Sequence, residues 1–413
     1  MITYILIFIN SIITSAINLA ISLKAFEITS SVYYVSLTVL LYNSAYIIMS
    51  WTWTKIAPSK DAPKKLLFAI FVGYLASSSV LGLSNAIYLV LICSVVIGLS
   101  SAVSSPLMMS VLGNQIGKDY LTVSRYNLIS SIASVIGYLL GWLFDNTEIL
   151  FLSLAVISAP ATATLRYLKV MTLIEFKKEL HISTTPMVTG RVKDAFTVTH
   201  SHTLLYDFRI LVEDFFKTIK KGVLREFQLL IFGTVVLFTA ISTFFTPFPA
   251  YLKSNKLSDG DIFVMNLVSS TTSILGFRAA SRVVNSIHKA WSILKLCVGL
   301  RVFIFLIPII SFTYIQELSV VKIFLIAFYM LIGFTWSFIS SSLTTLVLSI
   351  SERNRKGERL GHMNGAIGIG SILGSLISVY IGEYGFLIGY PFVGVLLIIS
   401  AAILHKASKT LVT

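Results

Sequence analysis

Long apolar segments alternate with short polar segments along almost the whole chain. Each apolar segment holds roughly 20 residues, enough for an α-helix to cross a hydrocarbon core about 30 Å thick. The pattern therefore predicts twelve membrane-spanning helices. They cover residues 2–23, 32–53, 66–84, 86–112, 122–144, 149–168, 227–251, 261–277, 291–313, 320–349, 362–381 and 386–404.

The composition agrees with a chain whose main solvent is a lipid bilayer. Hydrophobic residues make up 56% of the 413 residues and charged residues only 12%, whereas soluble domains carry about 25% charged residues. The first apolar segment follows no basic region and shows no clear cleavage site, so we expect a membrane helix there and not a signal peptide. The sequence thus predicts an all-α polytopic membrane protein.

Basic residues are distributed unequally between alternate loops. With the N-terminus inside, the outer loops hold only Lys24, Lys253, Lys256 and Lys322, and nearly all other lysines and arginines fall on the inner side. This asymmetry follows the positive-inside rule and predicts a multi-pass protein of the cell membrane with both termini cytoplasmic. The net charge of +14 then reflects topology and contact with anionic lipid. It does not indicate nucleic-acid binding, which requires a basic soluble domain.

Two parts of the chain repeat one register of small and polar residues. Residues 125–141 and 362–378 align at an offset of 237, which places Asn127 on Asn364, and Gly137 on Gly374. Segments 97–106 and 332–341 align at an offset of 235. Since both copies begin inside and run the same way, the repeats are parallel. The sequence predicts two pseudo-symmetric six-helix halves related by an axis along the membrane normal.

Domain boundaries follow from this repeat. We expect an N-terminal six-helix bundle over residues 1–170 and a C-terminal one over residues 226–413. Residues 171–225 form the longest polar stretch and end in an amphipathic pattern typical of a helix on the inner membrane surface. This segment is interpreted as a cytoplasmic linker between the halves, and a regulatory or partner-binding role is the alternative.

Two parallel six-helix halves, a long basic inner loop and cytoplasmic termini resemble the major facilitator superfamily (MFS). The stretch FTPFPAYL (245–252) and the repeated small-residue register are the local features that support the resemblance. It covers the entire chain. The chain departs from the family at its loop SWTWTKIAPSKDAPKK (50–65), which lacks the Asp-Arg signature often found between spans 2 and 3, and at the equivalent loop of the second half, which also lacks the acid.

The resemblance suggests a role for the repeated small residues. In the family, spans 5 and 11 face the opposite half, and small side chains let membrane helices approach closely. We interpret two strips as contacts on which the halves rock, with static packing as the alternative. The strips comprise Ala133, Ser134, Gly137 and Gly141 in span 5, and Gly370, Ser371, Gly374 and Ser378 in span 11.

Polar residues inside the spans are the candidates for a solute pathway, because a buried amide or hydroxyl needs a partner helix, water or ligand. Hydrogen bonds between or within helices are the alternative for each of them. The pathway candidates are Asn10, Thr14, Asn18, Asn43, Ser101, Ser105, Thr239, Thr243, Thr246 and Thr272. Three further residues near the inner membrane face are predicted to form an inner gate, namely Arg125, Asn127 and Asn364.

Charge inside the predicted spans bears on the solute. None of the eighteen Asp and Glu residues lies at the centre of a span, so a cationic solute has no evident counter-charge. Arg301 lies near the middle of span 9 and is a candidate anion ligand. A snorkelling or interhelical role is the alternative for this arginine. The pattern favours a neutral or anionic solute.

These features predict a secondary transporter that moves a small solute by alternating access, as the resemblance implies. A lipid flippase or scramblase on the same scaffold and a drug-type efflux carrier are the alternatives. The chain has no phosphate loop, no metal-spaced histidines and no nucleophile–base pair, so we expect neither an enzyme nor a metal or other cofactor. The expected partners are the solute and membrane lipid, with the protein acting as a monomer.

Overall fold

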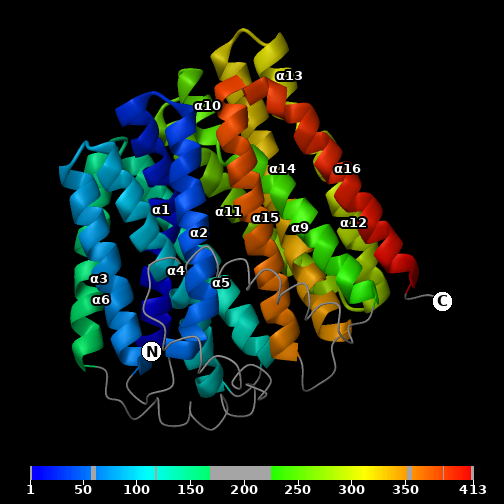
Figure 1. Ribbon diagram of the computed structural model, residues 1–413, viewed down its shortest axis with the longest axis horizontal. Helices are drawn as coiled ribbons and strands as arrows, with labels where there is room; N and C mark the ends of the chain where they lie inside the picture. The colour runs from blue at the N-terminus through cyan, green and yellow to red at the C-terminus, as the bar shows by residue number, and fades with distance from the viewer. Residues whose placement is uncertain are drawn as a thin grey trace, which may run out of the picture.

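A computed structural model describes residues 2–56, 62–116, 119–167, 225–350, 356–384 and 386–410 (Figure 1). The part of the chain N-terminal to the long linker forms six helices: α1 (Ile2–Thr29), α2 (Val32–Ile56), α3 (Ala62–Leu83), α4 (Ile87–Ile116), α5 (Asp119–Leu143) and α6 (Thr147–Tyr167). The segment 171–225 falls almost entirely outside the described residues, so its amphipathic helix stays a prediction.

The C-terminal part forms eight helices in the described residues. They are α9 (Arg225–Phe245), α10 (Phe248–Ser254), α11 (Asp259–Val283), α12 (Ile287–Ile304), α13 (Leu306–Tyr314), α14 (Leu318–Ile350), α15 (Lys356–Tyr384) and α16 (Phe386–Thr410). Two pairs of these helices make one span each. Predicted span 7 is α9 followed by α10, and predicted span 9 is α12 followed by α13.

Proline explains both interruptions. Pro247 separates α9 from α10 and has no N–H to continue the hydrogen-bond ladder. Pro308 follows the α12–α13 junction at Phe305, so the carbonyl of Ile304 lacks the donor that a regular helix would supply four residues later. Taken together with their interruptions, Glu226–Ser254 and Ile287–Tyr314 are each long and apolar enough to cross a membrane.

The count of spans predicted from the hydropathy pattern is confirmed. Ten helical segments are long and apolar enough to cross a membrane, and shorter apolar helices at Leu128–Leu143 and Thr147–Ala163 supply the other two. Predicted span 8, 261–277, is observed as the longer helix Asp259–Val283. The helix is longer because polar residues at both ends, including Arg278 and Arg282, continue it beyond the apolar segment.

The twelve spans form two six-helix halves that lie side by side, the N-terminal half in blue to cyan and the C-terminal half in green to red (Figure 1). Within the N-terminal half, α1 packs against α2, α4, α5 and α6. Two crossed pairs, α2 with α15 and α5 with α11, join the halves. We call the end with turns 30–31, 144–146, 255–258 and 315–317 the distal end, and the opposite end the proximal end.

Candidate functional site

One group of polar side chains lies in the interior of the N-terminal half. The Tyr74 and Ser101 hydroxyl oxygens are 3.1 Å apart, joining α3 to α4. Tyr42 on α2 lies within hydrogen-bonding reach of both Ser101 and Asn18. Asn18 is exposed although it lies in the middle of α1, a helix that is otherwise mostly buried. These four side chains therefore form a connected polar group that reaches a solvent-accessible surface.

The sequence analysis identified Asn18 and Ser101 but missed both tyrosines. A signal was present, because Tyr42 and Tyr74 lie well inside apolar segments, away from the interfacial positions that tyrosine prefers. A buried tyrosine hydroxyl usually has a polar partner, and here that partner is shared. Tyr74 is fully buried and contacts Ser101 on the side away from the exposed surface, while Tyr42 lies between Ser101 and Asn18.

Asn10, Thr14 and Asn18 are spaced four residues apart, which predicts one polar face along the helix. Asn10 and Thr14 are not exposed as Asn18 is. The Thr14 hydroxyl donates to the Asn10 carbonyl oxygen at 2.9 Å, within α1. Asn10 is 2% exposed, and its Oδ1 accepts no hydrogen bond from the described residues. The neighbouring Ser11 donates to Ser130 at 2.9 Å and so joins α1 to α5. This part of α1 packs inside the N-terminal half.

The threonines of span 7 are mostly satisfied by the protein itself. Thr239 and Thr243 are buried, and each hydroxyl donates to the carbonyl oxygen one turn earlier at 2.8 Å. Thr243 also reaches the Gly374 carbonyl oxygen on α15 at 3.3 Å. Thr272 on α11 likewise donates to carbonyl oxygens of its own helix. In this structure the hydroxyls serve helix packing.

Asn43 links the two halves. Its Nδ2 on α2 donates to Ser375 Oγ on α15 at 2.9 Å, and that oxygen lies 3.4 Å from Thr246 Oγ1 at the end of α9. Farther towards the distal end, Ser36 donates to the carbonyl oxygen of Ser378 at 3.4 Å. Polar contacts therefore run along the α2–α15 seam, and Asn43 is a candidate for half-to-half contact as well as for the pathway.

An aromatic pair faces a buried charge in the C-terminal half. The rings of Phe238 on α9 and Trp336 on α14 meet edge to face with centroids 5.8 Å apart. The Arg301 guanidinium carbon on α12 lies 5.8 Å from the Trp336 ring centroid, within the range of a cation–π interaction. Trp336 aligns with Ser101 at the repeat offset of 235. In the N-terminal half Tyr74 of the third span contacts Ser101. In the C-terminal half Arg301 of the third span contacts the aligned residue, Trp336.

Arg301 does not snorkel to the surface. It is 1% exposed, and its Nε has no hydrogen-bond partner among the described residues. The ion pairs found in the described part of the chain involve other cations. Arg301 lies in the last turn of α12, where the carbonyl end of the helix dipole offers partial compensation. The charge is therefore buried with only weak compensation.

Three predicted hinge glycines contact the first span of their own half. A β-carbon on Gly137 would lie 2.6 Å from the Ile12 carbonyl oxygen, and one on Gly374 would lie 2.4 Å from that of Thr239. Gly370 meets α9 in the same way, at the Val235 carbonyl oxygen. These strips therefore pack α5 on α1 and α15 on α9, not half against half.

Of the other residues in the two strips, some contact the opposite half and some stay within their own half. Gly141 does meet the opposite half, because a β-carbon there would lie 2.2 Å from the Phe263 ring on α11. Ser378 meets it through its carbonyl oxygen, as described above. Ala133 is fully buried, while Ser134 and Ser371 bond to their own helices. Of the strip residues, Gly141 and Ser378 therefore contact the opposite half, and both lie on the distal side of their strips.

Of the three residues predicted to form an inner gate, only Asn364 has a side chain that the structure describes. Asn364 is exposed near the proximal end of α15. The side chains of Arg125 and Asn127 on α5, and that of Ser105 on α4, lie outside the described residues. The inner-gate role of all three gate residues stays a prediction.

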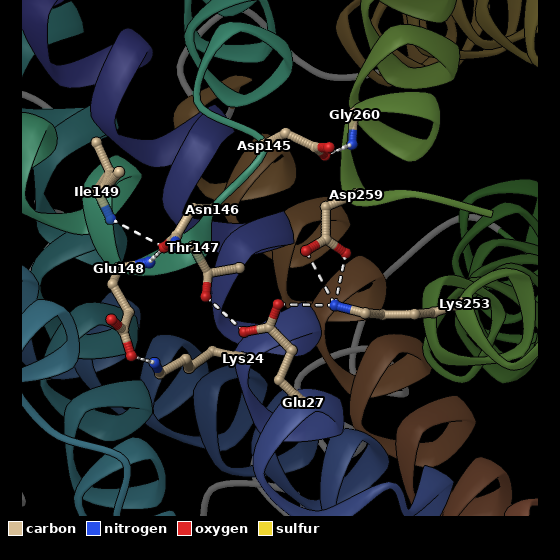
Figure 2. A network of polar contacts seen from close by, with 10 residues as sticks. All are labelled: Lys24, Glu27, Asp145, Asn146, Thr147, Glu148, Ile149, Lys253, Asp259 and Gly260. Atoms are coloured by element: carbon tan, nitrogen blue, oxygen red, sulfur yellow. Dashed lines mark hydrogen bonds and ion pairs between the residues drawn. The ribbon is translucent and has the colours of Figure 1, made fainter. Parts of the chain in front are cut away.

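Charged side chains link the halves at the distal end (Figure 2). Lys253 Nζ, at the end of α10, lies 2.7 Å from Glu27 Oε1 on α1 and 2.8 Å from Asp259 Oδ1 on α11. Asp145, after α5, accepts the Gly260 N–H at 2.7 Å. The Lys253–Glu27 and Asp145–Gly260 contacts cross from the N-terminal half to the C-terminal half. The sequence placed these residues at the same side of the membrane but did not pair them.

Two six-helix halves with polar groups in their interior define a polytopic membrane protein. The sequence profile of the Major Facilitator Superfamily matches residues 3–354, so the chain belongs to this family. No protein among those with curated descriptions matches the sequence.

Solved structures show the same fold at low sequence identity. A mutant of the nucleoside transporter NupG has a TM-score of 0.75 at 11% identity, with 98% of each chain covered. A POT family transporter in complex with a thioalcohol-conjugated peptide has a TM-score of 0.70 at 12% identity, covering 99% of this chain and 96% of that one. The human organic anion transporter MFSD10 (TETRAN) has a TM-score of 0.58 at 12% identity, with 98% of each chain covered.

Proposed function

We propose that this transporter moves a small neutral or anionic solute by alternating access between its two halves. The observation that carries the proposal is the exposed Asn18 in the middle of α1, which lies within hydrogen-bonding reach of Tyr42, as does Ser101. An amide exposed at mid-span, beside two hydroxyls, is a suitable partner for a hydrogen-bonding solute. Secondary transporters commonly bind their solutes near the midplane, between the halves.

The same proposal includes an orientation and a conformational state. Placing the basic proximal loops inside puts both termini in the cytoplasm and the distal end outside the cell membrane. The cross-half contacts of Asn43, Glu27 and Asp145 lie from mid-span to the distal end. They support a state that is closed towards the outside, with the solute site reached from the proximal end.

The solute class rests on charge. The acidic residues that the structure describes lie at helix ends and in turns, and none of them is paired with Arg301, which is buried against the Trp336 ring. A negative group at the aromatic wall would compensate this charge, and a positive group would be repelled. The names of two similar structures, a nucleoside and an organic anion transporter, are compatible with such solutes, although at this identity they establish the fold only.

Thermal stability in detergent provides the first test. Purified protein is heated with a panel of neutral solutes, organic anions, cations, amphiphilic drugs and lipids. A ligand that binds only the folded protein stabilises it by about 2.7 kcal/mol at a hundredfold excess over its dissociation constant. We expect a soluble neutral or anionic solute to raise the melting temperature, and Asn18→Ala to abolish that shift.

Thr243→Val is the matched control, because the Thr243 hydroxyl is buried and already bonded to carbonyl oxygens. This variant should keep the ligand-induced shift even if its own melting temperature falls. Equal loss of the shift in both variants would contradict the assignment of Asn18. Stabilisation by lipids alone would favour a flippase or scramblase, and stabilisation by cationic drugs alone would favour a drug-type efflux carrier.

A further inference from the structure

Six charged side chains gather where the two halves meet at the distal end (Figure 2). We call them the distal charge cluster, and they are Lys24, Glu27, Asp145, Glu148, Lys253 and Asp259. The first four belong to the N-terminal half and the last two to the C-terminal half. The cluster therefore exists in this form only while the halves are in contact.

Lys253 is shared by two carboxylates. Its Nζ donates to Glu27 Oε1 at 2.7 Å and to Asp259 Oδ2 at 2.9 Å. The two carboxyl groups are also within hydrogen-bonding reach of each other. Asp259 is 7% exposed, and its Oδ1, although 2.8 Å from Nζ, accepts no hydrogen bond of good geometry from the described residues. One buried carboxylate oxygen in the cluster is thus left without a proper donor.

The surrounding charges do not supply a second cation. Lys24 is 2% exposed and pairs with Glu148 at 3.0 Å. Lys322 on α14 pairs with Asp261 at 2.8 Å, and Lys256 is exposed in the distal turn. Asp145 adds a further negative charge at Gly260, the residue next to Asp259. With all groups ionised, four carboxylates face two ammonium groups in the cluster.

Separation of the halves would change this balance at Asp259. Lys253 and Asp259 belong to the same half and would stay together, whereas Glu27 and Asp145 would leave with the N-terminal half. Asp259 would then be paired with Lys253 in contact with water, without the Glu27 carboxylate beside it, while Asp261 would remain paired with Lys322. Two carboxylates in contact favour one bound proton, and so does burial. The closed arrangement therefore has the higher proton affinity.

We propose that the Glu27–Asp259 pair is a binding site for one proton, filled from the distal side when the halves close and emptied when they separate. The proton on Asp259 donates a hydrogen bond to the Glu27 carboxylate, which remains paired with Lys253. A ligand that binds one conformation better shifts the equilibrium towards it. Acid on the distal side therefore stabilises the distal-closed conformation. The inference rests on the proposed alternating access, but needs no knowledge of the solute.

The distance between labels on the two halves tests this site directly. Spin labels are attached at Leu83→Cys on α3 and Tyr314→Cys on α13, both 79% exposed at the distal end. The native Cys93 and Cys297 are buried, so labelling is directed to the introduced residues. Between about pH 8 and about pH 5, we expect the short-distance population to grow, by at most about tenfold in the closed-to-open ratio per pH unit for one proton.

Two variants that each remove one carboxylate charge should abolish the pH response. Asp259→Asn imitates the protonated group, so the short distance should dominate at both pH values. Glu27→Gln removes one of the two carboxylates and should likewise abolish the pH response. Glu317→Gln is the matched control, because Glu317 is an exposed distal acid outside the cluster, and it should respond like the parent protein.

Three results would overturn the proton site: no pH response in the parent protein, an unchanged response in both Asp259→Asn and Glu27→Gln, or a lost response in Glu317→Gln. Gel filtration and melting curves of each variant show whether it is folded, so misfolding is recognised separately. If two distance populations exist but ignore pH, alternating access stands and only the proton site fails. A single distance under all conditions, with every ligand tested, would count against alternating access itself.

Discussion

Gly374→Ala is expected to lower the melting temperature of the purified protein clearly, while Gly394→Ala on the neighbouring helix leaves it unchanged or slightly higher. A β-carbon at Gly374 would lie 2.4 Å from the Thr239 carbonyl oxygen and 2.8 Å from the Thr243 nitrogen. Both atoms belong to the α9 backbone, so α15 and α9 must move apart. Overpacking of this kind typically costs about 1–3 kcal/mol.

Gly394 provides the control, because a β-carbon there would meet no atom within 4 Å. Alanine is the better helix former by about 0.5–1 kcal/mol, so this variant should be neutral or stabilised. Similar melting temperatures for the two variants would show that the α9–α15 contact tolerates displacement. Static packing, the alternative reading of the strips, thus applies to Gly374 and Gly137.

Gly141 should behave differently from Gly374. Its close neighbour is the Phe263 ring in the opposite half, and a side chain can rotate where a backbone cannot. Gly141→Ala is expected to leave the melting temperature closer to that of the parent protein and to shift the distal label distance towards the longer population. A large loss of stability without any distance change would show that the α5–α11 contact is static.

Arg301→Met is expected to preserve or raise the stability of the protein and to abolish its response to anionic ligands. Replacing a poorly compensated buried charge by an apolar side chain of similar volume is often neutral or stabilising by about 1–4 kcal/mol. The lost cation–π contact with Trp336 offsets this by about 0.5–2 kcal/mol. The stability gain would therefore be small, and the loss of ligand response is the larger effect.

The expected loss can be estimated from Coulomb's law. A ligand anion on the far side of the Trp336 ring, about 8 Å from the guanidinium, would gain about 2 kcal/mol at an effective dielectric constant of about 20. That energy corresponds to roughly thirtyfold in affinity. Neutral ligands should keep their thermal shift in Arg301→Met, so the ratio of anionic to neutral affinity is the decisive measurement.

Lys295→Met is the matched control for Arg301→Met. Lys295 is on the same helix, is half-buried and donates to Ser408 on α16 at 3.1 Å. It should leave the anion-to-neutral ratio unchanged, whereas Arg301→Lys should retain part of it. An unchanged ratio in Arg301→Met, or a loss of several kcal/mol in its stability, would assign Arg301 a structural role.

The pairing of individual side chains was largely beyond the sequence. Asn18 and Ser101 were identified as pathway candidates, but the tyrosines that connect them, Tyr42 and Tyr74, were not. The repeat offset aligns Ser101 with Trp336, yet nothing in the alignment indicates that Arg301 lies behind the Trp336 ring. Such contacts depend on the rotation of each helix about its axis.

The strips of small residues illustrate the same limit. Their spacing correctly places Gly137 and Gly374 on one face of a helix, and their contacts explain why no larger residue fits. The sequence does not tell which neighbour that face meets. In a membrane, lipid and protein interior are equally apolar, so the hydrophobic pattern does not distinguish the faces of a helix.

The number of spans, the two parallel halves and the membrane class followed from the sequence by itself, because apolar length, loop charge and an internal repeat are one-dimensional properties of the chain. Tertiary structure alone decided the rest: Lys253 lies between Glu27 and Asp259, Asn43 bonds across the seam, and Arg301 is buried with no carboxylate paired to it among the described residues. The Glu27–Lys253 and Asn43–Ser375 contacts join residues 226 and 332 positions apart, and only the packing of helices brings them together.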